Sequence, residues 1–371
     1  MKFYRSSTDV FVIGGGPAGL AAAIAARQRG LEVTLADCAV PPIDKACGEG
    51  IMPDGIAAAR ALGISLEDAA AQPFRGIRFA EDGVSVEADF PRGHGYGVRR
   101  TALHGLMVER AAAAGVHLLW DGRVSGIAAD AVEVDGRQVR TRWIVGADGG
   151  NSPTRRWANL DASEHDSRRF AFRRHYRVAR WSEFMEIHWS DGRQIYITPV
   201  APGEICVVLI SSDPHLRLED ALMRFPEVSR RLEAGARSSR ERGGVSVSRR
   251  LRRVAKGRVA LVGDASGSVD AITGEGICLL FRQAVLLAEA LEAGDLARYQ
   301  AGHRRLGRRP ELMAGVMLML DRRGPLRRRA FRAMARQPRL FARMLATHVG
   351  ELSIFDSAAN GLALGWQLLT V

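Results

Sequence analysis

A glycine-rich turn near the amino terminus has the spacing that brings a protein backbone against a pyrophosphate group. Gly14, Gly16 and Gly19 form a G-x-G-x-x-G motif. The first glycine permits a tight turn, the second lets the backbone approach the phosphates, and the third lets a helix pack on a strand. Asp37 stands 18 residues after Gly19, where a carboxylate can accept hydrogen bonds from ribose hydroxyls. Together these residues predict a bound dinucleotide.

Two further segments place acids beside glycines or small residues. Asp148 lies in the sequence I-V-G-A-D-G-G-N-S-P-T-R, and Gly263 and Asp264 lie in G-R-V-A-L-V-G-D-A. A T-G-E-G sequence at 273–276 then opens a predicted helix. Taken singly, such acids are ordinary turn residues. Taken with the first motif, they predict one cofactor site assembled from three parts of the chain.

The elements that must position these motifs can be read from hydrophobic patterning. Residues 10–13 form a continuous apolar run typical of a buried strand, 20–29 form an alanine-rich helix ended by Gly30, and 31–35 form a second strand. This is a βαβ unit of a doubly wound sheet. Further strands are predicted within 76–90, 170–210 and 259–262, a helix at 101–114, and mostly helices from 276 onward.

The three motifs resemble, in order and spacing, those of flavoprotein monooxygenases of the para-hydroxybenzoate hydroxylase fold. The second motif is similar to the D-G-x-x-S-x-x-R motif of that superfamily, and the third to its G-D motif. The T-G-E-G-I sequence and the segment from Lys45 to Gly50 (K-A-C-G-E-G) are more similar to its geranylgeranyl reductase branch. The resemblance spans about residues 8–295 and implies an FAD-dependent oxidoreductase.

The fold implied is α/β, with a Rossmann-like FAD-binding domain interleaved with a β-sheet substrate domain and followed by C-terminal helices. The FAD-binding parts are expected at 1–75, 96–160 and 246–297, the substrate sheet at 76–95 and 161–245, and a basic helical region at 298–371.

Roles for individual residues follow from the resemblance. It implies that the three glycines hold the pyrophosphate and Asp37 the adenosine ribose, while Arg100 reaches the FAD phosphate or ribityl region. Asp148 would lie near the pyrophosphate and near any nicotinamide cofactor. The helix starting at Gly274 to Gly276 would direct its positive end at the flavin, which carries negative charge when reduced. The complete set of expected cofactor-binding residues is Gly14, Gly16, Gly19, Asp37, Lys45, Arg100, Asp148, Gly263, Asp264, Gly274 and Gly276.

Candidates for a catalytic role are few, because flavin chemistry requires no protein nucleophile. Cys47, His175 and Tyr196 are the candidates, with plain packing as the alternative for Cys47 and a structural role as the alternative for His175. The four cysteines are far apart and form no C-x-x-C pair, so we expect no metal site and no disulfide framework, as in a cytoplasmic protein.

The sequence leaves the reaction open. Reduced FAD can activate oxygen, deliver hydride to an alkene, or pass electrons on, with NAD(P)H or another donor supplying them. Monooxygenation of a hydrophobic aromatic, polyketide or lipid-like compound of secondary metabolism is slightly favoured, since no ferredoxin-like or second nucleotide domain is visible. Alkene reduction is the alternative, and Ala271, where relatives carry proline, leaves the two unresolved. A flavin halogenase is disfavoured because its W-x-W-x-I-P pattern is absent, and a non-catalytic flavin protein remains open.

The charge is concentrated at the C-terminal end. The net charge is +12, and between Arg298 and Arg343 there are 14 arginines against Glu311 and Asp321, which is also +12. With the apolar run 312–320, this favours either peripheral contact with an anionic membrane or a solvated face. Nucleic acid is a weaker alternative, since no aromatic stacking platform accompanies the arginines. No apolar run reaches the length of a membrane span.

Overall fold

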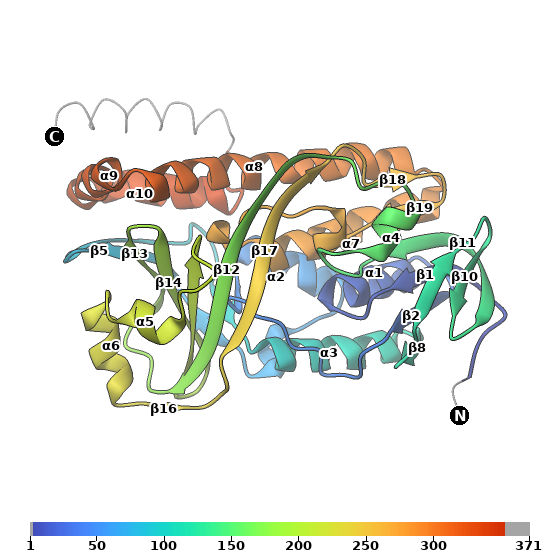
Figure 1. Cartoon of the computed structure of the whole chain (residues 1–371), viewed down its shortest axis with the longest axis horizontal. Coiled ribbons are helices and arrows are strands. Elements are labelled where there is room, and N and C mark those ends of the chain that lie inside the picture. The colour runs from blue at the N-terminus through green and yellow to red at the C-terminus, as the bar shows by residue number, and fades with distance from the viewer. Residues whose placement is uncertain (1–2, 353–371) are drawn as a thin grey trace.

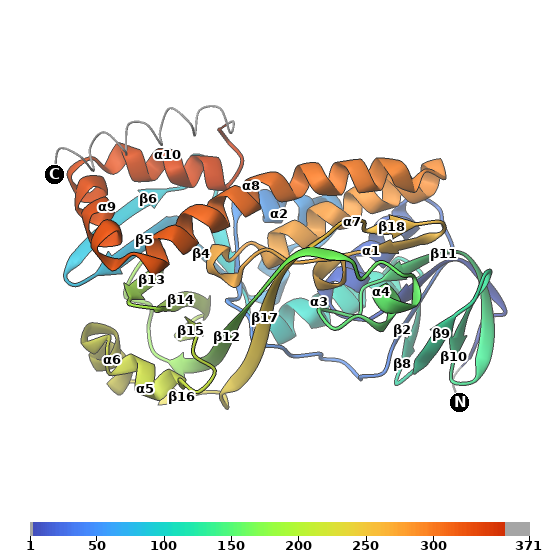
Figure 2. The same cartoon turned by 45° about the horizontal axis from the view of Figure 1, so that its top comes forward.

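The protein is built around two large β-sheets that lie end to end under a layer of C-terminal helices (Figure 1). The structure, a computed structural model, describes residues 3–352, so the end of the expected basic region, 353–371, lies outside the described residues. Two long paired strands, β12 (Ser163–Arg177) and β17 (Arg242–Leu251), run between the two halves in both views (Figures 1 and 2). The expected α/β fold class is confirmed. The boundaries of its six segments stay a prediction.

The first sheet is built around parallel strands, as expected for the predicted βαβ unit. β1 pairs in parallel with both β2 and β11, and Val10, Phe11 and Val12 are fully buried within it. Helix α1 packs on β2 and against α3 and α7. The path through this sheet is β18 (Ala255–Lys256), β19 (Val259–Leu261), β11 (Arg137–Gly146), β1 (Ser7–Ile13), β2 (Val33–Asp37) and β8 (His117–Trp120), with β10 (Ala131–Val134) and β9 (Val124–Ile127) beside β11.

The second sheet is antiparallel apart from the parallel pair β5 and β13. Alternate residues of its strands face opposite sides: Ile195 and Ile197 belong to a small core with α5 and α6, whereas Tyr196 faces the main core. Its order is β16 (Ala236–Arg237), β12 (Ser163–Arg177), β15 (Glu204–Ser211), β14 (Arg193–Ala201), β13 (Phe184–Ser190), β5 (Gly76–Glu81) and β6 (Val84–Asp89), with β17 (Arg242–Leu251) paired to β12. A third, small sheet contains β3 (Gly50–Ile51), β7 (Gly95–Gly97) and β4 (Gln72–Phe74).

Helices complete both halves. They are α1 (Pro17–Gln28), α2 (Pro53–Ala61), α3 (Arg100–Ala113), α4 (Pro153–Trp157), α5 (Leu218–Leu222), α6 (Pro226–Glu233), α7 (Gly276–Ala293), α8 (Leu296–Arg322), α9 (Gly324–Arg336) and α10 (Pro338–His348). In Figures 1 and 2 the long α8 crosses from the first sheet to the second, where α9 and α10 cover β5 and β6. Among the described residues, no helix is both long and apolar enough to cross a membrane.

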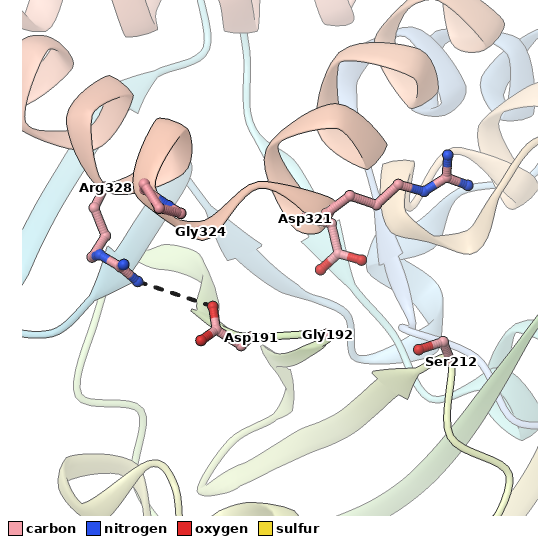
Figure 3. A pocket seen from close by; sticks show the side chains of 8 residues that line it. Asp191, Gly192, Ser212, Asp321, Gly324 and Arg328 are labelled. Atoms are coloured by element: carbon pink, nitrogen blue, oxygen red, sulfur yellow. Dashed lines mark ion pairs between the residues drawn. The ribbon is translucent and has the colours of Figure 1, made fainter.

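A buried arginine fixes the junction between α8 and α9. Arg327 is fully buried and donates two hydrogen bonds to Glu81 of β5, at 2.6 and 2.9 Å, and one to Asp191 at 2.8 Å. Figure 3 shows the adjoining surface hollow, where Asp191 also faces Arg328 at 4.0 Å. The C-terminal arginines therefore do not all belong to a solvated face: this one holds the helical layer on the sheet.

Candidate functional site

The glycine-rich turn has the shape that a bound pyrophosphate requires. A methyl group on Gly19 would lie 1.8 Å from the carbonyl oxygen of Gly14, so only glycine allows this contact between helix and turn. A methyl group on Gly16 would meet no protein atom within 4 Å, and α1 begins just after it without a side-chain cap. The free N–H groups of this helix end therefore face open space and can receive phosphate oxygens.

Asp37 lies beside this turn at the end of β2. Its Oδ2 accepts a hydrogen bond from the Gly15 N–H at 2.6 Å, and its Oδ1 accepts one from the Ala39 N–H at 2.7 Å. These two bonds orient the carboxylate next to the turn, as the predicted ribose contact needs. His104, which the sequence analysis missed, contacts the Gly15 carbonyl oxygen at 2.9 Å through Nε2. Burial lowers the pKa of His104, so its ring is neutral and supports the turn.

The second motif is held together by its own side chains. Asp148 accepts hydrogen bonds from the backbone N–H and hydroxyl of Thr154, at 2.9 and 2.8 Å, and from the Ser152 hydroxyl. Arg155 is buried and donates to the carbonyl oxygens of Gly150 and Ala265, which ties this motif to the third. The structure thus gives Asp148 a capping role at α4, and its predicted contact with a cofactor stays a prediction.

The third motif packs against the first motif. Gly263 has a φ of +61°, and a methyl group there would lie 2.5 Å from the Cβ of Ala18 in α1. The next residue, Asp264, accepts a hydrogen bond from Lys45 Nζ at 2.7 Å, so two predicted cofactor-binding side chains lie together although they are 219 residues apart. Both are about half exposed and can rearrange around a ligand.

Further glycines beside these motifs also face open space, and we call the region around the three motifs the cofactor trough. Methyl groups on Gly48, Gly274 and Gly276 would meet no protein atom within 4 Å, and α7 begins at Gly276 without a side-chain cap. Arg100, at the start of α3, has a buried Nε with no hydrogen-bond partner within the described residues. An uncapped helix end, an unpartnered guanidinium nitrogen and a line of glycines facing space fit an elongated anionic cofactor such as FAD.

His175 and Cys47 belong to a buried polar cluster beside this trough. His175 contacts Glu49 Oε2 through Nε2 at 2.7 Å and Ser239 through Nδ1 at 2.9 Å, so both ring nitrogens are occupied. Burial would raise the pKa of Glu49, but His175 and the ion pair with Arg173 at 2.9 Å hold it below its usual value. Cys47 accepts a long hydrogen bond from the Glu49 N–H at 3.4 Å. These contacts favour the structural alternative for both candidates.

Glu49, His175 and Cys206 place possible ligand atoms within 4.8 Å of one another. The guanidinium of Arg173 already occupies Glu49 Oε1, and a cation would have to compete with that charge. The cluster is therefore a poor metal site.

Tyr196 lines an apolar pocket between the second sheet and the C-terminal helices. It is buried, its hydroxyl donates to the Ile272 carbonyl oxygen at 2.6 Å, and burial raises its pKa. This hydrogen bond holds the turn that precedes Gly274, and it favours a structural role for Tyr196. The pocket is lined by apolar residues, five of them methionine, and by a polar edge; its residues are Gly50, Met52, Ile77, Phe79, Met185, Ile187, Tyr196, Thr273, Gly274, Met313, Met317, Phe341, Met344, Leu345 and His348.

Two polar residues at the edge of this pocket were not predicted as site residues. His348, the last residue of α10, lines the pocket, and Glu275 lies behind it at 3.8 Å. Glu275 stands in the T-G-E-G sequence noted above, but no sequence pattern indicated that it would be buried. His348 comes from a helix that no motif connected with the site.

The family described as FAD binding domain matches residues 7–306. The chain belongs to this family. This match confirms FAD as the cofactor and the predicted superfamily. Flavin monooxygenases and a geranylgeranyl reductase-like protein share the fold of this chain. The protein is an FAD-dependent oxidoreductase.

Relatives of this FAD-binding domain protein include two reductases. The chain is 29% identical over 320 residues to a menaquinone reductase of Mycobacterium tuberculosis, covering 79% of this chain and 78% of the relative. It is 32% identical over 339 residues to digeranylgeranylglycerophospholipid reductase 1 of Methanopyrus kandleri, covering 79% and 84%. A flavoprotein/dehydrogenase from Cytophaga hutchinsonii has the same fold, with a TM-score of 0.80, 16% identity and 93% of each chain covered.

Proposed function

We propose that this oxidoreductase reduces a carbon–carbon double bond in the isoprenoid chain of a lipid. The observation that carries this proposal is the methionine-rich apolar pocket, whose lining includes Thr273 and Gly274, the residues just before the expected flavin-binding end of α7. Menaquinone and digeranylgeranyl glycerophospholipids, the compounds in the relatives' names, both carry isoprenoid chains. The proposed reaction is thus alkene reduction, the alternative that the sequence left open, and not monooxygenation.

The residues of the trough would hold FAD in the following way. The turn at Gly14, Gly16 and Gly19 and the free end of α1 would bind the pyrophosphate, and Asp37 the adenosine ribose. Lys45, Arg100 and Asp264 would contact the phosphate and ribityl parts, and the free end of α7 the flavin edge. FAD would supply hydride once it is reduced by NAD(P)H or another donor. The protein's own task is to orient the lipid chain, exclude water and supply a proton.

The pocket explains why a flexible lipid chain suits this site. Its free volume is about 40 Å³, room for only a few water molecules, so a lipid chain must displace side chains. Met52 precedes α2, Met185 lies in β13 and Met317 lies in α8. Methionine side chains adapt to irregular apolar shapes at low cost. Such a lining suits a chain of branched isoprene units better than a rigid, hydrogen-bonding aromatic substrate.

We expect double-bond reduction without oxygen. Protein loaded with FAD, reduced with dithionite and kept under argon, should convert a geranylgeranyl lipid or a prenylated naphthoquinone to a product with two added hydrogens per turnover. Mass spectrometry of the extracted lipid measures this product, and protein left oxidised is the control. A product that contains an added oxygen atom and forms only in air would instead establish monooxygenation.

The basic face of α8 to α10 would bring the protein to the lipid. Of the 14 arginines between Arg298 and Arg343, the exposed ones are Arg298, Arg304, Arg305, Arg308, Arg322, Arg323, Arg329, Arg332, Arg336, Arg339 and Arg343. Leu312 and Met319 on α8 are also exposed, at 42% each, and can enter the headgroup boundary. We therefore propose peripheral contact with anionic membranes through this face.

Vesicle binding tests this contact. Each arginine near an anionic surface contributes up to about 1 kcal/mol, so replacing Arg329, Arg332 and Arg336 by glutamate should weaken co-sedimentation with anionic vesicles at least tenfold. The control replaces two exposed arginines, Arg224 and Arg230, by glutamate. They lie near α6, on the opposite side of the second sheet (Figure 1). Equal binding to neutral vesicles, or a preference for DNA at the same ionic strength, would contradict the proposal.

A further inference from the structure

The edge of the pocket next to Thr273 and Gly274 contains a buried acid and a buried histidine that face each other. Glu275 is 3% exposed and His348 is 9% exposed. Glu275 Oε2 and His348 Nδ1 are 3.8 Å apart, and neither atom has a hydrogen-bond partner within the described residues. Buried polar atoms without partners are rare in folded proteins and often mark functional sites.

The surrounding charges do not neutralise this pair. Arg309 lies 3.9 Å from Glu275 Oε1, but it is engaged with Asp54 at 3.0 Å. Arg282 contacts Asp54 as well, at 3.2 Å. The two arginines are thus shared with a second carboxylate, and Glu275 retains only a long contact with one of them.

Burial sets the protonation of both groups. It raises the pKa of Glu275 to about 8, against a lowering effect of Arg309 and Arg282 and a raising effect of Asp54. It lowers the pKa of His348 to about 4, where Arg309 lowers it further and Asp54 and the Thr273 backbone raise it. At neutral pH the pair therefore consists of a carboxylic acid beside a neutral imidazole, and the proton available for transfer resides on Glu275.

We propose that Glu275 and His348 form a relay that delivers a proton to the substrate in the pocket. The inference rests on the proposed double-bond reduction, which adds a hydride, with both electrons, to one carbon and a proton to the other. Bound FAD, once reduced, would supply the hydride and would itself be oxidised. Glu275 gives its proton to His348 Nδ1, and the imidazolium gives a proton to the second carbon, so the ring returns to its neutral form.

The step leaves Glu275 as a carboxylate, which Arg309 can stabilise until a solvent proton replaces the one lost. The separation of 3.8 Å is longer than a hydrogen bond. Catalytic hydrogen bonds are often long in the unliganded protein and shorten when substrate binds. Within the lining of the pocket, the other titratable side chain is Tyr196, whose hydroxyl is committed to Ile272. His348 is therefore the group placed to act on the substrate, and Glu275 acts through it.

Glu275→Gln tests the relay, because it keeps the size of the side chain and removes its titration. General acid catalysis contributes about 10²–10⁴-fold, so we expect double-bond reduction to slow by at least about 100-fold while substrate affinity changes less than twofold. Wild-type activity should fall above pH about 8 as Glu275 ionises, and the variant should show no such fall. His348→Gln should lose a similar factor, and the double variant should be no slower than either single variant.

A second measurement does not depend on activity or on FAD. The infrared absorption of a carboxylic acid should be present in wild-type apoprotein at neutral pH, vanish with a midpoint near pH 8, and be missing in Glu275→Gln. Glu186→Gln is the matched control, since Glu186 is a buried acid 2.9 Å from His188 on the opposite face of β13. Burial would raise its pKa, but His188 and Trp181 lower it to about 2, so this variant should leave both the infrared band and the pH profile unchanged.

The outcomes separate the two proposals. Wild-type protein that reduces no isoprenoid double bond overturns the proposed function, and the relay with it. Wild-type protein that does so, with Glu275→Gln retaining more than a third of the rate or no titrating carboxylic acid band, overturns the relay alone.

Discussion

Gly16→Ala is expected to give a protein that folds normally and no longer binds FAD. The added methyl group meets no protein atom within 4 Å, so the apoprotein should unfold at the wild-type temperature. The same methyl group would occupy the space between the free end of α1 and the pyrophosphate, and we expect FAD affinity to fall by at least about 100-fold, or ~2.7 kcal/mol. Gly19→Ala should lose both normal folding and FAD binding, since its methyl group would lie 1.8 Å from the Gly14 carbonyl oxygen.

Flavin content and thermal unfolding together measure this contrast. Wild-type protein should release FAD, and not FMN, on acid treatment, because Asp37 and the glycine turn require the adenosine half. Gly105→Ala is the control: it lies inside α3 in open space, outside the three motifs, and should keep FAD and gain a little stability. If Gly16→Ala retained FAD at wild-type affinity, the pyrophosphate would have to lie elsewhere.

Arg327→Met should produce the largest loss of stability among substitutions outside the cofactor trough. The change leaves Glu81, which is 6% exposed, as a buried carboxylate without its bidentate partner. Breaking a buried ion pair from one side costs about 3–5 kcal/mol. Denaturant unfolding of the apoprotein measures this cost.

The reason for the loss can be checked by removing both charges. Glu81→Leu combined with Arg327→Met should recover most of the stability, because no uncompensated charge then remains in the interior. Arg329→Met, two residues along the same helix and exposed, should change stability by no more than about 0.5 kcal/mol. A loss below about 1 kcal/mol for Arg327→Met would show that Glu81 finds water or another partner.

The sequence alone was sufficient to predict FAD as the cofactor and the fold that binds it, whereas the individual cofactor-binding residues stay predictions. The glycine spacing and Asp37 predicted the first βαβ unit, because backbone geometry in such a turn depends on residues close in sequence. Family motifs also located Lys45 and Asp264, which the structure brings within 2.7 Å. The contacts of Glu49 and His104 were not predicted, although Glu49 lies in the quoted K-A-C-G-E-G segment, because both contacts join segments that are distant in the sequence.

Contacts between distant segments were also missed around the apolar pocket and the C-terminal helices. Glu275 was part of a quoted motif, yet it lies beside Arg309 of α8 and His348 of α10, which come 34 and 73 residues later in the chain. Arg327 looked like one more cation in an amphipathic helix. Its partner Glu81 lies 246 residues earlier, so only the folded structure could reveal that it is internal.

The sequence separation of 246 residues between Arg327 and Glu81 affects how the chain folds during its synthesis. A ribosome releases β5 long before α9, so Glu81 remains without its partner until most of the protein has been made. Contacts of such long sequence separation form late and slow the folding of a domain. The face of the second sheet that α9 covers is therefore expected to stay exposed during translation. A chain truncated before α9 should be a substrate for chaperones and proteases.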